Sequence, residues 1–290
     1  MVYLCLFSFV IQFNNLYQKT NVNIEVIYRE TLELNSPIPL DREAKLISNE
    51  DESLYYSARS DKPGLKGKDW RGNNIEGNSF TSSSTSKDHI EGGLLFRTYG
   101  VDTYGNCVYI SNKSNTMKVR AMNELTITYT EPNIPKLKWE IKKDSTKTIG
   151  KHLCIKADTE FRGRKYEVWF TPEIPINKGP WKLNGLPGLI LQATDKEGKI
   201  KFDFIKLKPI TEKIIFSTEI ENWTGKQCSY EESKTLGMEW SIKDWIKRSN
   251  LSFVKGSVQR LNVNPDDFLE RYPKEQNAIL KKYQKYLTVK

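Results

Sequence analysis

The sequence predicts a mainly β fold of the α+β class: a curved antiparallel sheet, open or shaped as a half-barrel, with helices at the C-terminus. Several segments alternate apolar and polar residues with period two, which is typical of strands with one solvated face. Apolar residues recur at helical spacing only toward the end of the chain. We therefore expect a β domain over 21–228 and a helical C-terminal extension over 229–290.

The N-terminal residues 1–20 begin with an apolar run and then become polar. The run is too short to cross a membrane as a helix and has the length of the apolar region of a signal peptide. The positive residues that usually precede such a region are missing. We expect a truncated signal peptide and no membrane span in the mature chain, and the alternative is a buried N-terminal strand.

The β domain is expected to start with a strand over about 22–34, where apolar and polar residues roughly alternate. Residues 60–92 are rich in Gly, Ser, Asn and charge and lack periodicity, so they predict a mobile excursion from the sheet. Alternation recurs from about 125 to 220, which predicts an antiparallel meander. Within it, 195–198 predicts a hairpin loop, and the apolar run 189–191 predicts a strand covered on both faces.

The C-terminal extension contains two helical patterns. In the first, apolar residues between 238 and 246 share one face. The second starts with Asn264 as a cap and Pro265 in the first turn. Pro273 is expected to kink or split this second helix, because proline cannot donate a backbone hydrogen bond.

The stretch from 169 to 194 is unusual because prolines and glycines alternate with large apolar residues. Proline fixes backbone angles and glycine releases them, so the stretch predicts a stiff, buried loop. Pro187 followed by Gly188 suits a type II turn, in which Gly188 takes a positive φ. The residues expected to form the rigid structural motif are Gly179, Pro180, Gly185, Pro187, Gly188 and Leu189.

Two roles are open for this loop. Architecture is favoured, with the loop as a plug at one end of the sheet core. The alternative is recognition, with Trp181, Leu183 and Leu186 lining an apolar pocket or contacting a partner.

Two arginines flank a turn glycine in the sequence FRGR, residues 161–164. We expect Arg162 and Arg164 to face solvent and close a hairpin. The alternative is that they point the same way and grip an anionic group.

Charge and motifs give little support to catalysis or nucleic-acid binding. The net charge is +9, but the basic residues are interspersed with acidic and apolar ones, as on a solvated sheet face. Neither His89 nor His152 has metal-ligand spacing to a cysteine, and no nucleophile elbow or phosphate-binding loop occurs. We expect no catalytic residue, metal or cofactor. Cys107, Cys154 and Cys228 allow one disulfide or three free thiols.

Five segments follow one another in a specific order: TKTIG at 146–150, LCIKA at 153–157, FRGR at 161–164, VWFTPEIPI at 168–176 and GPWKLNGLPGLIL at 179–191. They resemble the signature of the GLPGLI family, the Porph_ging-type exported proteins of Bacteroidetes. The resemblance implies an envelope protein of the periplasm or outer membrane, encoded near TonB-dependent receptors. It implies no catalytic residues, because none is assigned in the family.

We therefore expect a non-enzymatic binding or assembly module of the cell envelope. Two more specific forms of this function are open. One is a carrier of an apolar ligand, by analogy with the curved sheets of periplasmic lipoprotein carriers, and the other is a partner of a TonB-dependent receptor. The alternative is an envelope hydrolase or peptidase, which requires a nucleophile and a base within hydrogen-bond reach.

Overall fold

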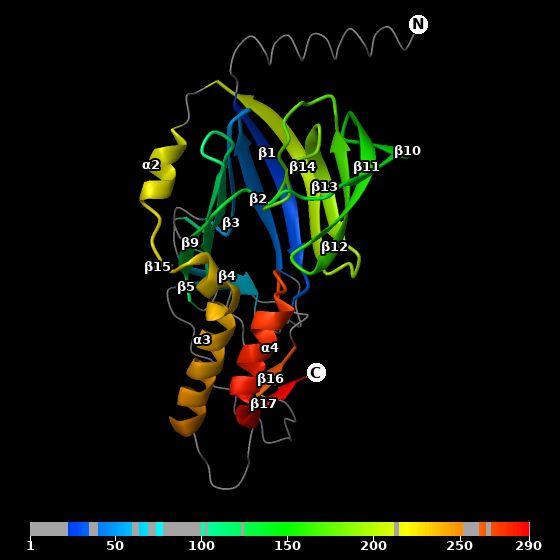
Figure 1. Ribbon diagram of the computed structural model, residues 1–290. Coiled ribbons are helices and arrows are strands. Elements are labelled where there is room, and N and C mark those ends of the chain that lie inside the picture. Colours follow the sequence, from blue (N-terminus) through cyan, green and yellow to red (C-terminus); the bar gives the residue numbers. More distant parts are fainter. Residues whose placement is uncertain are drawn as a thin grey trace, which may run out of the picture.

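One 12-stranded sheet is the largest unit of the described structure (Figure 1). The computed structural model describes residues 23–34, 40–59, 64–68, 74–77, 100–101, 104–122, 125–211, 215–251, 261–264 and 268–289. The signal peptide predicted for residues 1–20 lies outside this part of the chain, as does most of the excursion predicted for 60–92.

In sheet order the strands are β10 (Glu140–Ile149), β11 (His152–Phe161), β12 (Arg164–Thr171), β13 (Leu189–Asp195), β14 (Ile200–Ile210), β1 (Asn23–Leu32), β2 (Leu40–Ser48), β3 (Glu52–Ser57), β7 (Asn106–Ser111), β8 (Thr116–Ala121), β9 (Ile127–Glu131) and β15 (Lys226–Gln227). Neighbours pair in antiparallel fashion except β15, which runs parallel to β9. The sheet does not close into a barrel, since β10 and β15 are its two edges. The prediction of a mainly β fold with C-terminal helices is confirmed.

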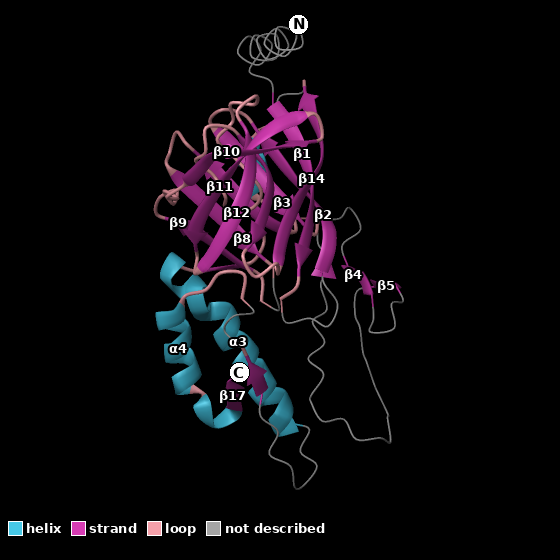
Figure 2. Cartoon of the chain, turned by 90° about the vertical axis from the view of Figure 1, so that its right-hand side faces the viewer, coloured by secondary structure: helices cyan, strands magenta, loops and turns pink. Residues whose placement is uncertain are grey.

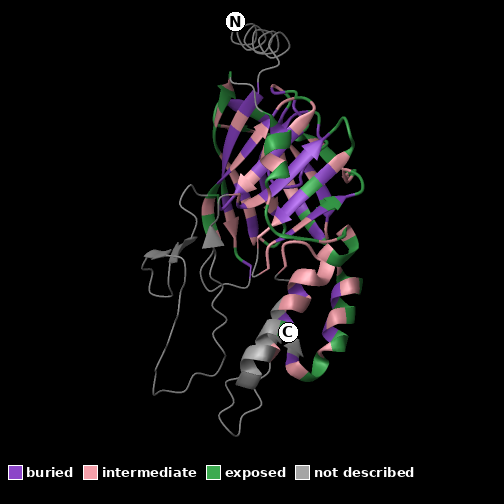
Figure 3. Cartoon of the chain, turned by 90° about the vertical axis from the view of Figure 1, so that its left-hand side faces the viewer, coloured by how far each residue is buried: buried purple, intermediate pink, exposed green. Residues whose placement is uncertain are grey.

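The sheet is strongly curled. Tyr55 on β3 and Phe202 on β14 are both buried, and their ring centroids lie 6.3 Å apart. Strands β1 and β2 separate these strands in the sheet, so a flat sheet would hold them about 14 Å apart. The curl brings the two halves of the sheet together around one apolar core, visible as the buried interior in Figure 3.

The predicted meander is correct over β10–β14, which follow one another along the chain and in the sheet. It is wrong at both ends. Strand β9 lies near the opposite edge from β10, and the segment expected to continue the meander forms α2 (Phe216–Glu221). Phe216 is buried against Tyr109, with ring centroids 6.2 Å apart, and Ile220 packs against the same small apolar cluster. Apolar residues four positions apart, such as Phe216 and Ile220, lie on one face of a helix and also on one face of a strand. The pattern therefore does not distinguish the two structures.

Helices α3 (Tyr230–Leu251) and α4 (Pro273–Lys282) extend from one end of the sheet (Figure 2). They share a small apolar core with β16 (Leu261–Val263) and β17 (Leu287–Val289), and η2 (Gln284–Tyr286) leads from α4 into β17. The kink or split predicted at Pro273 is wrong, because Pro273 is the first residue of α4, where its missing N–H costs no hydrogen bond. Residues 268–272 lead into α4 without helical structure.

The excursion contributes β4 (Gly64–Lys68) and β5 (Asn74–Gly77), which pair with each other, and β4 also pairs with β6 (Gly100–Val101) in a separate three-stranded sheet. These strands were not expected from the composition of 60–92. Across the described residues, none of the helices has the length and apolar character needed to pass through a membrane.

Candidate functional site

The loop between β12 and β13, residues 172–188, lies inside the curl of the sheet, and we call it the Pro/Gly loop. Toward β13, the Lys178 carbonyl accepts a hydrogen bond from the Ile190 N–H at 3.0 Å. Toward the opposite half of the sheet, Lys178 Nζ donates to Asn112 Oδ1 at 2.6 Å, in the turn between β7 and β8. The loop therefore bridges the two halves of the curled sheet.

The type II turn predicted at Pro187–Gly188 is wrong. The positive φ belongs to Gly185 (92°), and Gly188 does not adopt one. Gly188 is required for a different reason: a Cβ at this position would lie 2.2 Å from the backbone oxygen of Thr171, on the adjacent strand β12. Leu189 then begins β13, as predicted.

The second predicted corner, at Gly179–Pro180, is a tight turn in which the Leu183 N–H donates to the Pro180 carbonyl at 3.1 Å. Trp181 occupies this turn with a φ of 54°, which is uncommon for a residue other than glycine. At Gly179, a Cβ would lie 2.8 Å from the Ile190 Cβ, so the loop packs directly on β13.

The three apolar residues assigned to recognition all lie in the main core. Trp181 is 6% exposed, and Leu183 and Leu186 are 0% and 1% exposed. The Trp181 ring packs on Phe161 and Tyr166, with centroids 5.6 and 6.3 Å away. The structure therefore places all three residues inside the protein's own core, packed with the sheet.

The two arginines of the FRGR segment lie at a hairpin, as expected, but their predicted exposure to solvent is wrong. Phe161 pairs with Arg164 across the β11–β12 turn, and Arg162 and Gly163 have φ values of 52° and 69°, which suit a type I′ turn. The Arg164 side chain is fully buried and pairs with Asp195 at 2.8 Å. The Arg162 side chain is only 13% exposed.

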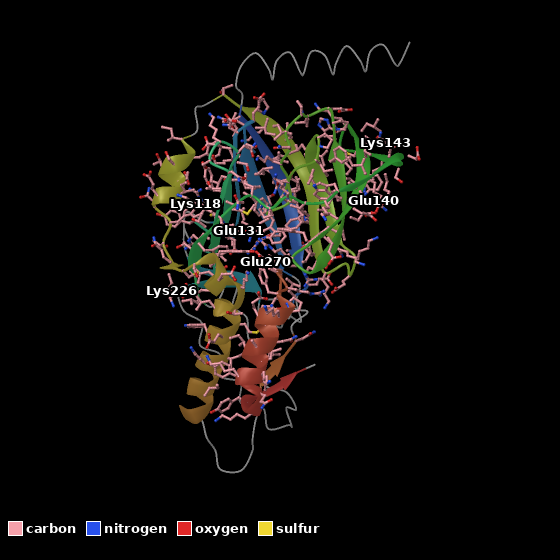
Figure 4. The ribbon with its side chains drawn as sticks, viewed as in Figure 1. Lys118, Glu131, Glu140, Lys143, Lys226 and Glu270 are labelled. Atoms are coloured by element: carbon pink, nitrogen blue, oxygen red, sulfur yellow. The ribbon has the colours of Figure 1, made fainter. Side chains whose placement is uncertain are left out.

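A buried group of charged residues forms beside this turn. Lys182 Nζ donates to Glu131 Oε1 at 2.7 Å, to Glu270 Oε1 at 2.5 Å and to the hydroxyl of Tyr129 at 2.9 Å. Arg162 donates to Glu131 through Nη2, and its Nε lies 3.4 Å from Glu270 Oε2. We call these five residues the Lys182 cluster. Figure 4 shows Glu131 and Glu270 near each other at the end of the sheet from which the helices extend.

Four different segments supply the Lys182 cluster. Tyr129 and Glu131 belong to β9, Arg162 to the β11–β12 turn, Lys182 to the Pro/Gly loop and Glu270 to residues 268–272. The cluster contains two cations and two carboxylates, so its charges balance. Folding thus brings together residues that are distant in the sequence.

The charged state of the cluster is stabilised by mutual attraction. Burial acts to lower the pKa of Lys182, but the carboxylates of Glu270 and Glu131 outweigh it, and the pKa lies above its usual value. Burial acts to raise the pKa of Glu270, but Lys182 and Arg162 outweigh it, and the pKa lies below its usual value. Burial raises the pKa of the Tyr129 hydroxyl, which therefore stays protonated and acts as a neutral partner.

Residues 268–272, which we call the docked segment, lie against the β11–β12 turn. Arg164 Nη2 donates to the Phe268 carbonyl at 2.8 Å, and the Arg271 N–H donates to the Arg162 carbonyl at 2.9 Å. The Arg271 guanidinium also forms two hydrogen bonds of 2.7 Å with Glu197. Backbone and side chains of the segment are therefore held on both sides of Glu270.

Lys178 differs from Lys182 although both lysines are buried in the same loop. Its partner is the amide oxygen of Asn112, and no carboxylate of the described residues forms an ion pair with it. Burial lowers the pKa of Lys178 to about 8, with Asp51 opposing that effect in part. Lys178 therefore loses its proton at a lower pH than Lys182.

The other candidate chemical groups have structural partners. His152 Nδ1 lies 2.9 Å from Glu173 Oε2, and His89 lies outside the described residues. Cys107, Cys154 and Cys228 are all free thiols, so the structure contains no disulfide among them. Within the described part of the chain, His, Cys, Asp and Glu form no group of three suited to a metal ion.

Sequence reasoning identifies Arg162 but not Lys182, Glu131 or Glu270. Lys182 does carry a usable signal, because it stands between Trp181 and Leu183 in a loop expected to be buried, and a buried charge is usually paired with an opposite one. Neither glutamate carries a local signal. Their role arises only from the folding of β9 and of the docked segment around the loop.

Comparison with known proteins supports the resemblance over part of the chain. Residues 159–192 match the model of the family described as "Protein of unknown function (Porph_ging)". No curated protein matches the chain. Two solved structures of PNGF-II, in space groups P21 and C2, each give a TM-score of 0.44, with 18% and 16% sequence identity over 79% and 83% of this chain. This chain spans 34% and 36% of their length.

Proposed function

We propose, on the premise that residues 159–192 carry the Porph_ging signature, that this protein is a non-enzymatic binding or assembly module exported to the cell envelope. The binding role is supported by the Lys182 cluster. There the β domain holds a non-helical segment from a distant part of the chain by its glutamate and its backbone, which is how peptide-recognition sites hold their ligands.

An assembly role is favoured over carriage of an apolar ligand. The residues expected to line a ligand pocket, Trp181, Leu183 and Leu186, pack on the chain's own core. A carrier would have to move the Pro/Gly loop out of the sheet to admit an acyl chain. Breaking the ion pairs of Lys182 with Glu131 and Glu270 would oppose that movement.

Export and a partner in the outer membrane, such as a TonB-dependent receptor, follow from the family resemblance and are part of the proposal. The hydrolase alternative needs a nucleophile beside a base. In the part of the chain that the structure describes, the ring of His152 contacts Glu173 and forms no hydrogen bond with a serine, threonine or cysteine side chain, so no observation favours that alternative.

The proposal is tested by cross-linking in intact cells, followed by fractionation and mass spectrometry of the tagged full-length chain. We expect the chain in the envelope fraction with one recurrent protein partner. The cross-links should weaken in a Lys182→Met variant and persist in Lys118→Met, a matched change at an exposed lysine of β8. A cytoplasmic chain, or partner cross-links that both variants retain, would contradict the proposal.

A further inference from the structure

We propose that the Lys182 cluster is a receptor for the carboxylate of a glutamate in a partner peptide, and that Glu270 of the chain's own docked segment occupies it in this structure. This inference rests on the proposed binding role and names the chemistry of the ligand.

The charge balance of the cluster defines the ligand. Without Glu270, Lys182 and Arg162 contribute two positive charges and Glu131 contributes one negative charge, which leaves one net positive charge. A single carboxylate neutralises that charge, whereas a phosphate dianion would exceed it. The receptor is therefore matched to a glutamate or aspartate side chain, and the reach of Glu270 favours glutamate.

Backbone contacts of the docked segment favour a peptide ligand over a free acid. Arg164 grips the carbonyl of Phe268 on one side of Glu270, and the Arg162 carbonyl accepts from the N–H of Arg271 on the other. Gly163 permits this close approach, because a Cβ there would lie 2.7 Å from the Arg271 Cβ. These contacts do not depend on the side chains that a partner peptide would carry.

The receptor has hydrogen-bonding capacity that the docked segment leaves unused. The Tyr166 hydroxyl is buried and forms no hydrogen bond within the described structure, and Arg162 Nε is buried with a 3.4 Å ion-pair contact to Glu270 Oε2 but no hydrogen bond. Arg162 Nε belongs to the cluster, and the Tyr166 ring packs on Trp181 beside it. Buried donors are almost always satisfied in folded proteins, so a ligand with a further acceptor fits the site better than the docked segment does.

The site is accessible at its margin, since the side chains of Arg162 and Glu270 are 13% and 16% exposed. The docked segment competes with any partner because covalent linkage gives it an effective concentration of about millimolar. A partner peptide therefore binds well only when it supplies the missing acceptor or when the docked segment is weakened. This competition is the basis of the test.

The first experiment removes the Glu270 carboxylate and offers the site a small carboxylic acid, propionate, in its place. Glu270→Ala in the full-length chain leaves room for propionate, and thermal unfolding is followed in sodium propionate and in sodium chloride at equal ionic strength. We expect propionate to raise the melting temperature of Glu270→Ala above its value in chloride. Wild type and Glu140→Ala, an exposed control on β10, should not distinguish the salts. Equal effects of both salts on Glu270→Ala would overturn the inference.

The second experiment uses a peptide and does not depend on the stability of the alanine variant. A fluorescent peptide of residues 264–275 is titrated into full-length Glu270→Gln/Arg271→Ala, in which the docked segment has lost its charged contacts. We expect binding about tenfold tighter than to wild type, and about tenfold tighter than binding of the same peptide with Gln at its position 270. Affinity that does not depend on the peptide glutamate would overturn the inference.

Both experiments use purified protein and defined probes, so they are independent of the cross-linking test. Failure of carboxylate binding would remove the glutamate receptor, whereas the cross-linking result decides separately whether the chain has an envelope partner at this site. A cytoplasmic chain would remove the proposed function while the receptor chemistry could still be measured.

Discussion

Lys182 Nζ and Glu131 Oε1 lie 2.7 Å apart, and their side chains are 0% and 2% exposed. The pair joins the Pro/Gly loop, which connects β12 to β13, with β9 near the far edge of the sheet. A buried ion pair adds little net stability compared with apolar packing, but removal of one partner is costly. We conclude that the pair fixes the position of the loop inside the curl.

Lys182→Met is expected to destabilise the protein by about 3–5 kcal/mol, because Glu131 and Glu270 would remain buried with less positive charge. The free energy of unfolding in urea measures this loss. Lys118→Met, on the exposed face of β8, should change it by less than about 0.5 kcal/mol. Equal effects of the two substitutions would show that Lys182 contributes no more to stability than an exposed lysine.

Gly188→Ala is expected to destabilise the protein by more than about 1 kcal/mol, because the new Cβ would collide with the backbone oxygen of Thr171. Gly198→Ala is the control. Gly198 has a φ of 72° and open space around it, so that substitution carries backbone strain alone, about 1 kcal/mol. Chemical denaturation of both variants separates the two causes. A smaller loss at Gly188 than at Gly198 would refute the close-approach explanation.

The hairpins of the β10–β14 half could be predicted because their signals are local. Gly198, with a φ of 72°, closes the turn between β13 and β14, and the Arg162–Gly163 pair closes the turn between β11 and β12. The positive φ predicted for Gly188 failed because tolerance of positive φ and close backbone approach both require glycine. A sequence alone does not distinguish these two requirements.

The Lys182 cluster could not be predicted, because its members come from four segments. Lys182 lies 51 residues from Glu131 and 88 residues from Glu270, and no local rule pairs them. The expectation that Arg162 and Arg164 face solvent failed for the same reason. Hairpin arginines are usually exposed, but here the docked segment and Asp195 cover them.

Gly163→Ala is expected to release the docked segment, because the added Cβ would lie 2.7 Å from the Arg271 Cβ. Release should accelerate hydrogen exchange at the Arg271 amide, which donates to the Arg162 carbonyl, and should speed tryptic cleavage after Arg271. Gly150→Ala is the control, since Gly150 also has a positive φ (60°) but meets only the flexible side chain of Phe204. Unchanged exchange in Gly163→Ala would show that the segment is held without this contact.

Lys178→Met is expected to have the opposite effect to Lys182→Met, although both lysines are buried in one loop. The folded-state pKa of Lys178, lowered by burial to about 8, lies below the usual 10.5. Between these values the unfolded chain binds more protons than the folded chain, so this group makes stability rise with pH from about 8 to 10.5. Below pH 8 both states are protonated, and the folded chain carries the full cost of a buried charge.

Removal of that charge should therefore make Lys178→Met more stable than wild type by about 1–3 kcal/mol at pH 7. The advantage should shrink as the pH approaches 10. Urea unfolding of both proteins at pH 7, 8, 9 and 10 measures the difference, in which the titration of the tyrosines cancels. Parallel pH profiles for the two proteins would show that Lys178 titrates normally. A loss of stability at pH 7 would show that its bond to Asn112 outweighs the cost of burial.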